Sequence, residues 1–247
     1  MEASANRIEP GRVIGEAFET YRNYAAVLLG GALIVIGVAG VINGLLAASE
    51  SLLLILLGLL VSFVAGALYT GYVVKLVQDV RDGRLDQSVG GLFSAAAPFI
   101  LTLILNGIVF WIAVGIGLVL LIIPGLILIT IWAVVAPSIV VENRGAIEAF
   151  GRSRELVRGN GWSVFGAIVI AFLIVIAISI VAGAIGAAIG DAGRVIVGAI
   201  GNVISYPILA LVSSILFFDL GGGAGAIPPA SEQPPAAPPP AAPPPAA

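Results

Sequence analysis

Six long apolar segments dominate this chain of 247 residues and constrain what it can fold into. Each is about 20 residues or longer, which lets a helix cross roughly 30 Å of hydrocarbon. We place the spans near residues 24–48, 52–77, 97–119, 122–141, 162–188 and 195–218. The sequence therefore predicts an all-α polytopic membrane protein with six transmembrane helices.

The composition excludes a water-soluble fold and several kinds of chemistry. Hydrophobic residues make up 60% of the chain and charged residues only 10%, whereas a soluble domain carries about 25% charged residues. The chain has no Cys and no His, which removes thiolate chemistry and the usual general base near neutral pH. A net charge of -3 does not indicate a nucleic-acid partner, and we expect no cofactor or metal.

The third and fourth spans are nearly fused, with Pro124-Gly125 at the break between them. This break is either a tight hairpin or a kink. We favour the hairpin, because residues 97–141 are far too long for one span. The turn is then expected near residues 120–125.

Three parts are expected along the chain: a loose N-terminus at 1–10, a membrane domain at 11–220, and a tail at 221–247. Residues 11–22 are expected to form an amphipathic helix that lies on the membrane surface, and the alternative is a helix packed against other protein. The tail begins with a Gly-rich hinge at 221–225, and residues 228–247 are mostly Pro and Ala. Such a segment is typical of a disordered spacer, although it could dock a protein partner.

Basic residues give the orientation, because they concentrate on the cytoplasmic side of membrane proteins. With six spans, ten of the eleven Lys and Arg residues fall on one side, and only Arg194 falls on the other. We therefore expect a multi-pass protein of the cell membrane with both termini in the cytoplasm.

A threefold internal repeat is suggested by similar short segments before each pair of spans. These are VIGEAF at 13–18, SVGGLF at 88–93 and AIEAF at 146–150. Each unit would be a short interfacial helix followed by a helical hairpin, and the three units would be parallel. The alternative is that any cytoplasmic loop before a span tends to look amphipathic.

The segment 144–160 follows the fourth span and carries several arginines on an amphipathic pattern. Arg152, Arg154 and Arg158 are candidates to contact anionic lipid head groups, or they only determine topology. Glu142 lies directly before this segment. We expect it to pair with Arg152 or Arg154 and hold the surface helix against the bundle.

Other polar and helix-breaking residues within the spans are read as structural. Asn43, Asn106 and Asn202 are expected to hydrogen-bond between helices rather than to contact a substrate. Pro137 lies in the fourth span and is expected to kink it. No charged residue lies near the centre of a span, so ion-coupled transport is weakly supported.

The spacing PG…P…E…A…S..L..G..W resembles the membrane domain often found beside bacterial glycerophosphoryl diester phosphodiesterases. That resemblance implies six spans and, for a free-standing member, no established activity. Position 150 is Phe where Leu is common in that family, and Ile131 stands where many members have a basic residue. The residues that carry the resemblance are Pro124, Gly125, Pro137, Glu142, Ala149, Ser153, Leu156, Gly159, Trp162 and Asp219.

Three functions follow from these patterns. The leading hypothesis is a non-enzymatic accessory or scaffold that organises membrane lipids or a partner at the cytoplasmic face. The alternative is a transporter or flippase-like carrier of a lipid or small amphiphile, which would need a cavity at the middle of the membrane. A membrane-bound enzyme is the least supported, because no catalytic constellation is found in the sequence. The sequence leaves the oligomeric state open.

Overall fold

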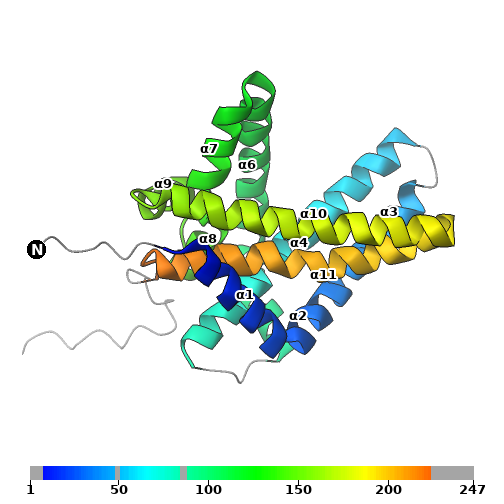
Figure 1. Ribbon diagram of the computed structural model, residues 1–247, viewed down its shortest axis with the longest axis horizontal. Coiled ribbons are helices and arrows are strands. Elements are labelled where there is room, and N and C mark those ends of the chain that lie inside the picture. The colour runs from blue at the N-terminus through cyan, green and yellow to red at the C-terminus, as the bar shows by residue number, and fades with distance from the viewer. Residues whose placement is uncertain (1–7, 48–50, 84–87, 224–247) are drawn as a thin grey trace, which may run out of the picture.

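The computed structural model describes residues 8–47, 51–83 and 88–223, and these residues form helices and connecting turns with no strand among them (Figure 1). The predictions for residues 1–7 and for residues 224–247 of the hinge and tail lie outside the described residues. In chain order the elements are α1 (Pro10–Asn23), α2 (Ala25–Ala32), η1 (Leu33–Gly37), α3 (Val38–Ala47), α4 (Leu52–Arg81), α5 (Val89–Ala96), η2 (Ala97–Phe99), α6 (Ile100–Leu120), α7 (Ile122–Ile131), α8 (Val135–Glu142), α9 (Glu148–Val157), α10 (Gly161–Ile189) and α11 (Asp191–Asp219).

Six helical stretches in this part of the chain are long and apolar enough to cross a membrane. The first runs through α2, the π-helical turn η1 and α3. The third joins α5, η2 and α6, and the fourth joins α7 and α8. Their bounds are Ala25–Asn43, Leu52–Arg81, Val89–Leu120, Ile122–Glu142, Gly161–Ile189 and Gly193–Asp219. The predicted number of helices able to span a membrane is confirmed, and their bounds differ from the predicted ones by up to eight residues, at the start of the third.

Three antiparallel hairpins, α3–α4, α6–α7 and α10–α11, diverge from one another (Figure 1). In this view α6–α7 rises to the top, whereas α3–α4 and α10–α11 extend to the right, away from the end where α1 begins and α11 finishes. Large apolar side chains near the tips are well exposed, such as Leu53 at 75% and Val119 at 87%. These surfaces would face lipid in a membrane.

The expected hairpin between the third and fourth spans is present. Helix α6 ends at Leu120, Leu121 is extended with φ -158°, and α7 begins at Ile122. The turn is tight enough that a Cβ added to Gly125 would lie 2.5 Å from Cγ of Leu118. A glycine is therefore needed at position 125.

Two tyrosines of α4 join the first two spans inside the molecule. The Tyr69 hydroxyl donates to the Leu28 carbonyl at 2.9 Å, and the Tyr72 hydroxyl donates to the Val27 carbonyl at 2.7 Å. Both rings are fully buried, with centroids 5.6 Å apart. Because each hydroxyl has a hydrogen-bond partner, these large side chains can be buried without leaving a polar atom unsatisfied.

Helix α1 packs against protein along part of its apolar face, as in the alternative to the expected surface helix. It contacts α10 and α11 and buries Val13 and Ala17. The Tyr21 hydroxyl donates to the Ile204 carbonyl of α11 at 3.2 Å. Phe18 remains half-exposed on the same helix.

Candidate functional site

The fourth span is interrupted between α7 and α8, at residues 132–134. Pro137 has no N–H, so it cannot bond the carbonyl of Ala133 four residues earlier, as a helical residue would. The Ser213 hydroxyl of α11 donates to that carbonyl instead, at 2.7 Å. The kink expected at Pro137 is therefore a break in the helix, and α11 supplies the missing hydrogen bond.

A second hydroxyl, that of Ser153 on α9, satisfies two more backbone groups at this break. It donates to the Ile131 carbonyl at 2.9 Å and accepts from the Val134 N–H at 3.2 Å. Backbone groups in a membrane domain that lie away from water must be bonded within the protein. Ser153 thus fixes α9 to the interruption of the fourth span.

Glu142, the last residue of α8, has a side chain that is fully buried. The Arg152 guanidinium of α9 forms two hydrogen bonds to this carboxylate, each 2.8 Å long, from Nε and Nη2. The backbone N–H of Gly223, just beyond α11, donates to the same carboxylate at 3.2 Å, and Arg144 Nε lies 3.4 Å from it. Of the two partners expected for Glu142, Arg152 is the one in contact.

This bidentate pair joins α8, α9 and the residues after α11. Bidentate arginine–carboxylate pairs are directional and among the stronger hydrogen-bonded contacts. The hydrogen bonds to Glu142 raise the pKa of Arg152 above its ordinary value, so the guanidinium stays charged. Removing one partner of such a pair leaves an uncompensated charge in a water-poor site.

A second group of charges surrounds Asp219, the last residue of α11, whose side chain is only 8% exposed. Arg12 of α1 lies 2.8 Å from the Asp219 carboxylate, and Arg81 at the end of α4 lies 3.2 Å from it. Arg81 also contacts Glu16 of α1 at 2.5 Å. Burial raises the pKa of Glu16 despite these neighbouring arginines. We call the Glu142 and Asp219 groups together the charged end.

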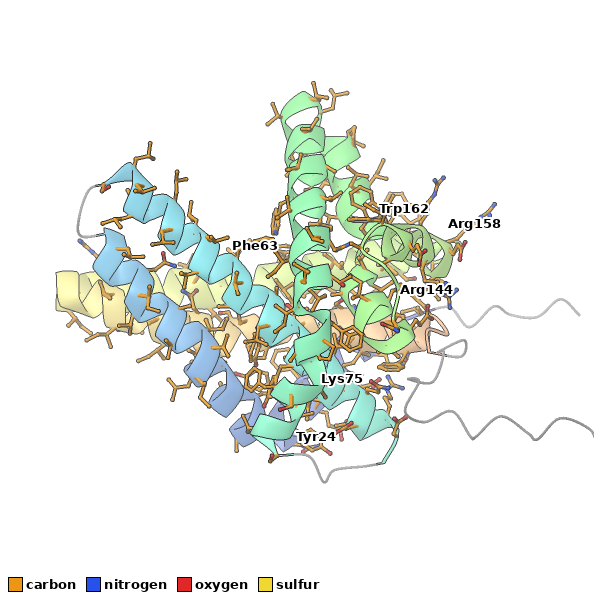
Figure 2. The ribbon with its side chains drawn as sticks, turned by 180° about the vertical axis from the view of Figure 1, so that it is seen from behind. Tyr24, Phe63, Lys75, Arg144, Arg158 and Trp162 are labelled. Atoms are coloured by element: carbon orange, nitrogen blue, oxygen red, sulfur yellow. The ribbon has the colours of Figure 1, made fainter. Side chains whose placement is uncertain are left out.

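The three arginines that were candidates for lipid contact separate into two kinds. Arg152 is bound to Glu142 within the protein, and its side chain is 23% exposed. Arg154 and Arg158 are exposed, and neither has an ion-pair partner among the described residues. Trp162, at the start of α10, is 88% exposed. Figure 2 shows Arg158 extending outward at the same end of the molecule as Trp162.

Other residues of the sequence motif shape the backbone around this site. Gly159 has φ 89°, a left-handed conformation that favours glycine, directly after α9. Ala149 and Leu156 are buried on the inner side of α9. Phe150 packs on Trp132 at the helix break, with ring centroids 4.6 Å apart. Pro124 lies in the first turn of α7, next to the hairpin.

The chemistry available at the charged end is ionic and structural. No group of three or more His, Cys, Asp or Glu side chains in the described ranges is placed to hold a metal ion. The carboxylates of Glu142 and Asp219 are both occupied by arginines. Arg154 on α9 and Arg158 directly after it remain exposed, beside the exposed Glu155, while the inner face of α9 packs on the protein.

A family described as "Domain of unknown function (DUF7847)" matches residues 45–185, more than half of the chain. The chain belongs to this family. No curated protein and no solved structure matches the chain. The DUF7847 match brings no link to glycerophosphoryl diester phosphodiesterases.

The DUF7847 region contains the helix break and the Glu142–Arg152 pair. It does not contain Ser213, Asp219 or Gly223, which complete the charged end from the C-terminal side. Sequence reasoning missed Ser213 and Gly223. A proline within a span does predict an orphan carbonyl four residues earlier, but not which distant hydroxyl will bond it.

Proposed function

We propose that this protein is a non-enzymatic membrane scaffold that gathers anionic lipids at the cytoplasmic face. The observation that carries this proposal is the exposure of Arg154 on α9 and of Arg158 directly after it. Ser153 and the Glu142–Arg152 pair hold α9 against the rest of the protein. An arginine near an anionic membrane surface contributes about 1 kcal/mol to binding. Trp162 is suited to the head-group level of the bilayer.

The proposal places the charged end in the cytoplasm of a cell and the hairpin tips on the opposite side. It is supported by the ten basic residues on one side of the six spans. Arg194 lies on the opposite side, near the tip of the α10–α11 hairpin. Both termini are then cytoplasmic, and the proline-rich residues 228–247 are available to a protein partner there.

The threefold repeat and the resemblance to the phosphodiesterase-associated domain also belong to this proposal. The repeat is supported by a cyclic pattern of contacts, in which each short helix packs on the preceding hairpin. Helix α5 contacts α4, α9 contacts α7 and α8, and α1 contacts α10 and α11 of the last hairpin. A pseudo-threefold scaffold of this kind would place three short helices around one end of the molecule.

The test is native mass spectrometry of the full chain with dioleoyl phosphatidylglycerol and dioleoyl phosphatidylcholine as probes. Two arginines at about 1 kcal/mol each give roughly a 30-fold preference for the anionic lipid. We expect Arg154→Ala with Arg158→Ala to remove most of it. Arg22→Ala is the matched control, because Arg22 is also an exposed arginine with no ion pair to any described residue, but it lies on α1. Equal lipid retention by the double variant and the wild type would reject the proposal.

A carrier for a lipid is the second candidate function. It is favoured by one observation, a cavity between the first hairpin and α11 of the third. Transport of a fluorescent lipid between vesicle leaflets is the corresponding assay. A rate no higher than that of protein-free vesicles would reject the carrier.

A further inference from the structure

A cavity of about 310 Å³ lies between the first hairpin and α11, and it shares no residue with the charged end. In Figure 1 the α3–α4 and α10–α11 hairpins diverge toward their tips. Small and aliphatic side chains make most of its walls, and no lining residue carries a charge. The residues that line it are Ile36, Ala39, Gly40, Asn43, Ser62, Ala65, Val195, Gly198, Ala199, Asn202 and Tyr206.

The polar residues of the cavity lie far from both ends of their spans. Ser62 is ten residues from the start of α4 at Leu52, and Asn202 is eleven residues from the start of α11 at Asp191. At 1.5 Å of rise per residue, each lies about 15 Å from its hairpin tip. This is roughly half the thickness of the hydrocarbon core.

Two of these polar groups have no hydrogen-bond partner among the described residues. Asn43 donates to Ser62, so that pair satisfies itself across the α3–α4 hairpin. The Asn202 amide and the Tyr206 hydroxyl form no hydrogen bond with any described residue, and both side chains are exposed toward the cavity. Unpaired amide and hydroxyl groups in hydrocarbon are costly.

The lining defines the chemistry of what can fill the cavity. Asn202 offers donors and an acceptor, and Tyr206 offers one hydroxyl. Without a charged side chain nearby, a charged head group would remain uncompensated at this depth. The apolar walls of Ile36 and Val195 suit a hydrocarbon chain.

We propose that this cavity binds the head of an uncharged lipid through its oxygen atoms, accepting hydrogen bonds from the Asn202 amide and the Tyr206 hydroxyl. Diglycerides and isoprenoid quinones share this chemistry, since both carry carbonyl oxygens next to long apolar chains. This site extends the second candidate function, the lipid carrier, by naming a class of lipid that it would bind. Binding is measured separately from transport. Binding without transport would reject the carrier and leave the site standing.

The experiment is native mass spectrometry of the full chain with dioleoylglycerol in one arm, a short-chain isoprenoid quinone in the second, and dioleoyl phosphatidylglycerol as the charged comparison. Gly198→Leu fills the cavity, because a Cβ at Gly198 meets nothing within 4 Å. Gly183→Leu on α10 is the matched control, since its Cβ is equally free and it does not line the cavity. Tyr206→Phe removes a single oxygen atom and provides a variant with little effect on packing.

We expect Gly198→Leu to lower retention of one neutral lipid at least tenfold and Gly183→Leu to leave it unchanged. Loss of one hydrogen bond in Tyr206→Phe should lower retention about three- to tenfold. The site is refuted if neither neutral lipid is retained by the wild type, if the phospholipid is retained equally well at the same residues, or if both glycine variants behave alike. A dimer that Gly198→Leu dissociates and Gly183→Leu does not would also refute it, because a second copy would then fill the cavity.

Discussion

Replacing Ser153 by Ala tests whether α9 maintains the interruption in the fourth span. The Ser153 hydroxyl bonds both the Ile131 carbonyl and the Val134 N–H. Its loss leaves one donor and one acceptor unpaired in the protein interior, at about 1–3 kcal/mol for a buried unsatisfied group. Because Ile131 is only half-buried, we expect Ser153→Ala to lower the free energy of unfolding by about 2–4 kcal/mol.

Ser214→Ala is the matched control, because Ser214 is buried as completely as Ser153. Its hydroxyl donates to the Ala210 carbonyl within the same helix, 2.7 Å away. That carbonyl keeps its place in the helical ladder when the hydroxyl is removed, so the expected loss is below about 1 kcal/mol.

The free energy can be measured by titration of mixed micelles with dodecyl sulfate, followed by tryptophan fluorescence. Trp132 lies at the helix break and reports on its packing against Phe150. Ser153→Ala is expected to cost more because it leaves the Ile131 carbonyl and the Val134 N–H unpaired. Equal losses of unfolding free energy for Ser153→Ala and Ser214→Ala would refute this explanation.

Three further predictions concern the hairpin and the charged end. Gly125→Ala should destabilise the protein by about 1–3 kcal/mol in the same titration, because its Cβ would collide with Leu118. Gly115→Ala should have little effect, because its Cβ meets nothing within 4 Å, and equal effects of the two variants would contradict the tight turn. Asp219→Asn should lower the free energy of unfolding by about 1 kcal/mol or less, because its arginine partners are partly exposed. The loss should be smaller at high salt, and a loss that does not depend on salt would be evidence against an ionic role. Burial raises the pKa of Glu16, so the folded protein binds this proton more tightly than the unfolded chain does. The free energy of unfolding should therefore fall as pH rises from the ordinary pKa of 4.5 through the raised one. Glu16→Gln should flatten this pH dependence, and an unchanged pH dependence would exclude Glu16 as its source.

The sequence predicted the parts of the fold that depend on local pattern. Span number, the hairpin next to Pro124-Gly125 and the helix after Glu142 all follow from apolar length, helix breakers and amphipathic spacing. The pairing of Glu142 with an arginine of α9 was also expected, because ten residues separate Glu142 from Arg152 and a surface helix brings them together.

The rest depends on contacts between residues far apart in the chain. Ser213 bonds a carbonyl 80 residues earlier, and Gly223 reaches a carboxylate 81 residues earlier. Asn106 was expected to join two spans, but its amide donates to the Ala146 carbonyl in the turn before α9. Asn202 was expected to join two spans as well, and among the described residues it has no partner. Residue spacing alone cannot fix the divergence of the hairpins that decides these outcomes.

The most direct test of the scaffold is the effect of Glu142→Gln on retention of phosphatidylglycerol, measured by native mass spectrometry on the folded, monodisperse fraction. This change removes a negative charge and frees Arg152, so charge alone predicts tighter binding of the anionic lipid. If the Glu142–Arg152 pair holds α9 in place, the change instead releases the helix that presents Arg154 and Arg158. We predict that retention falls toward the level of the Arg154 and Arg158 double variant. An increase, or no change, would contradict the proposal that this pair positions a lipid-binding surface.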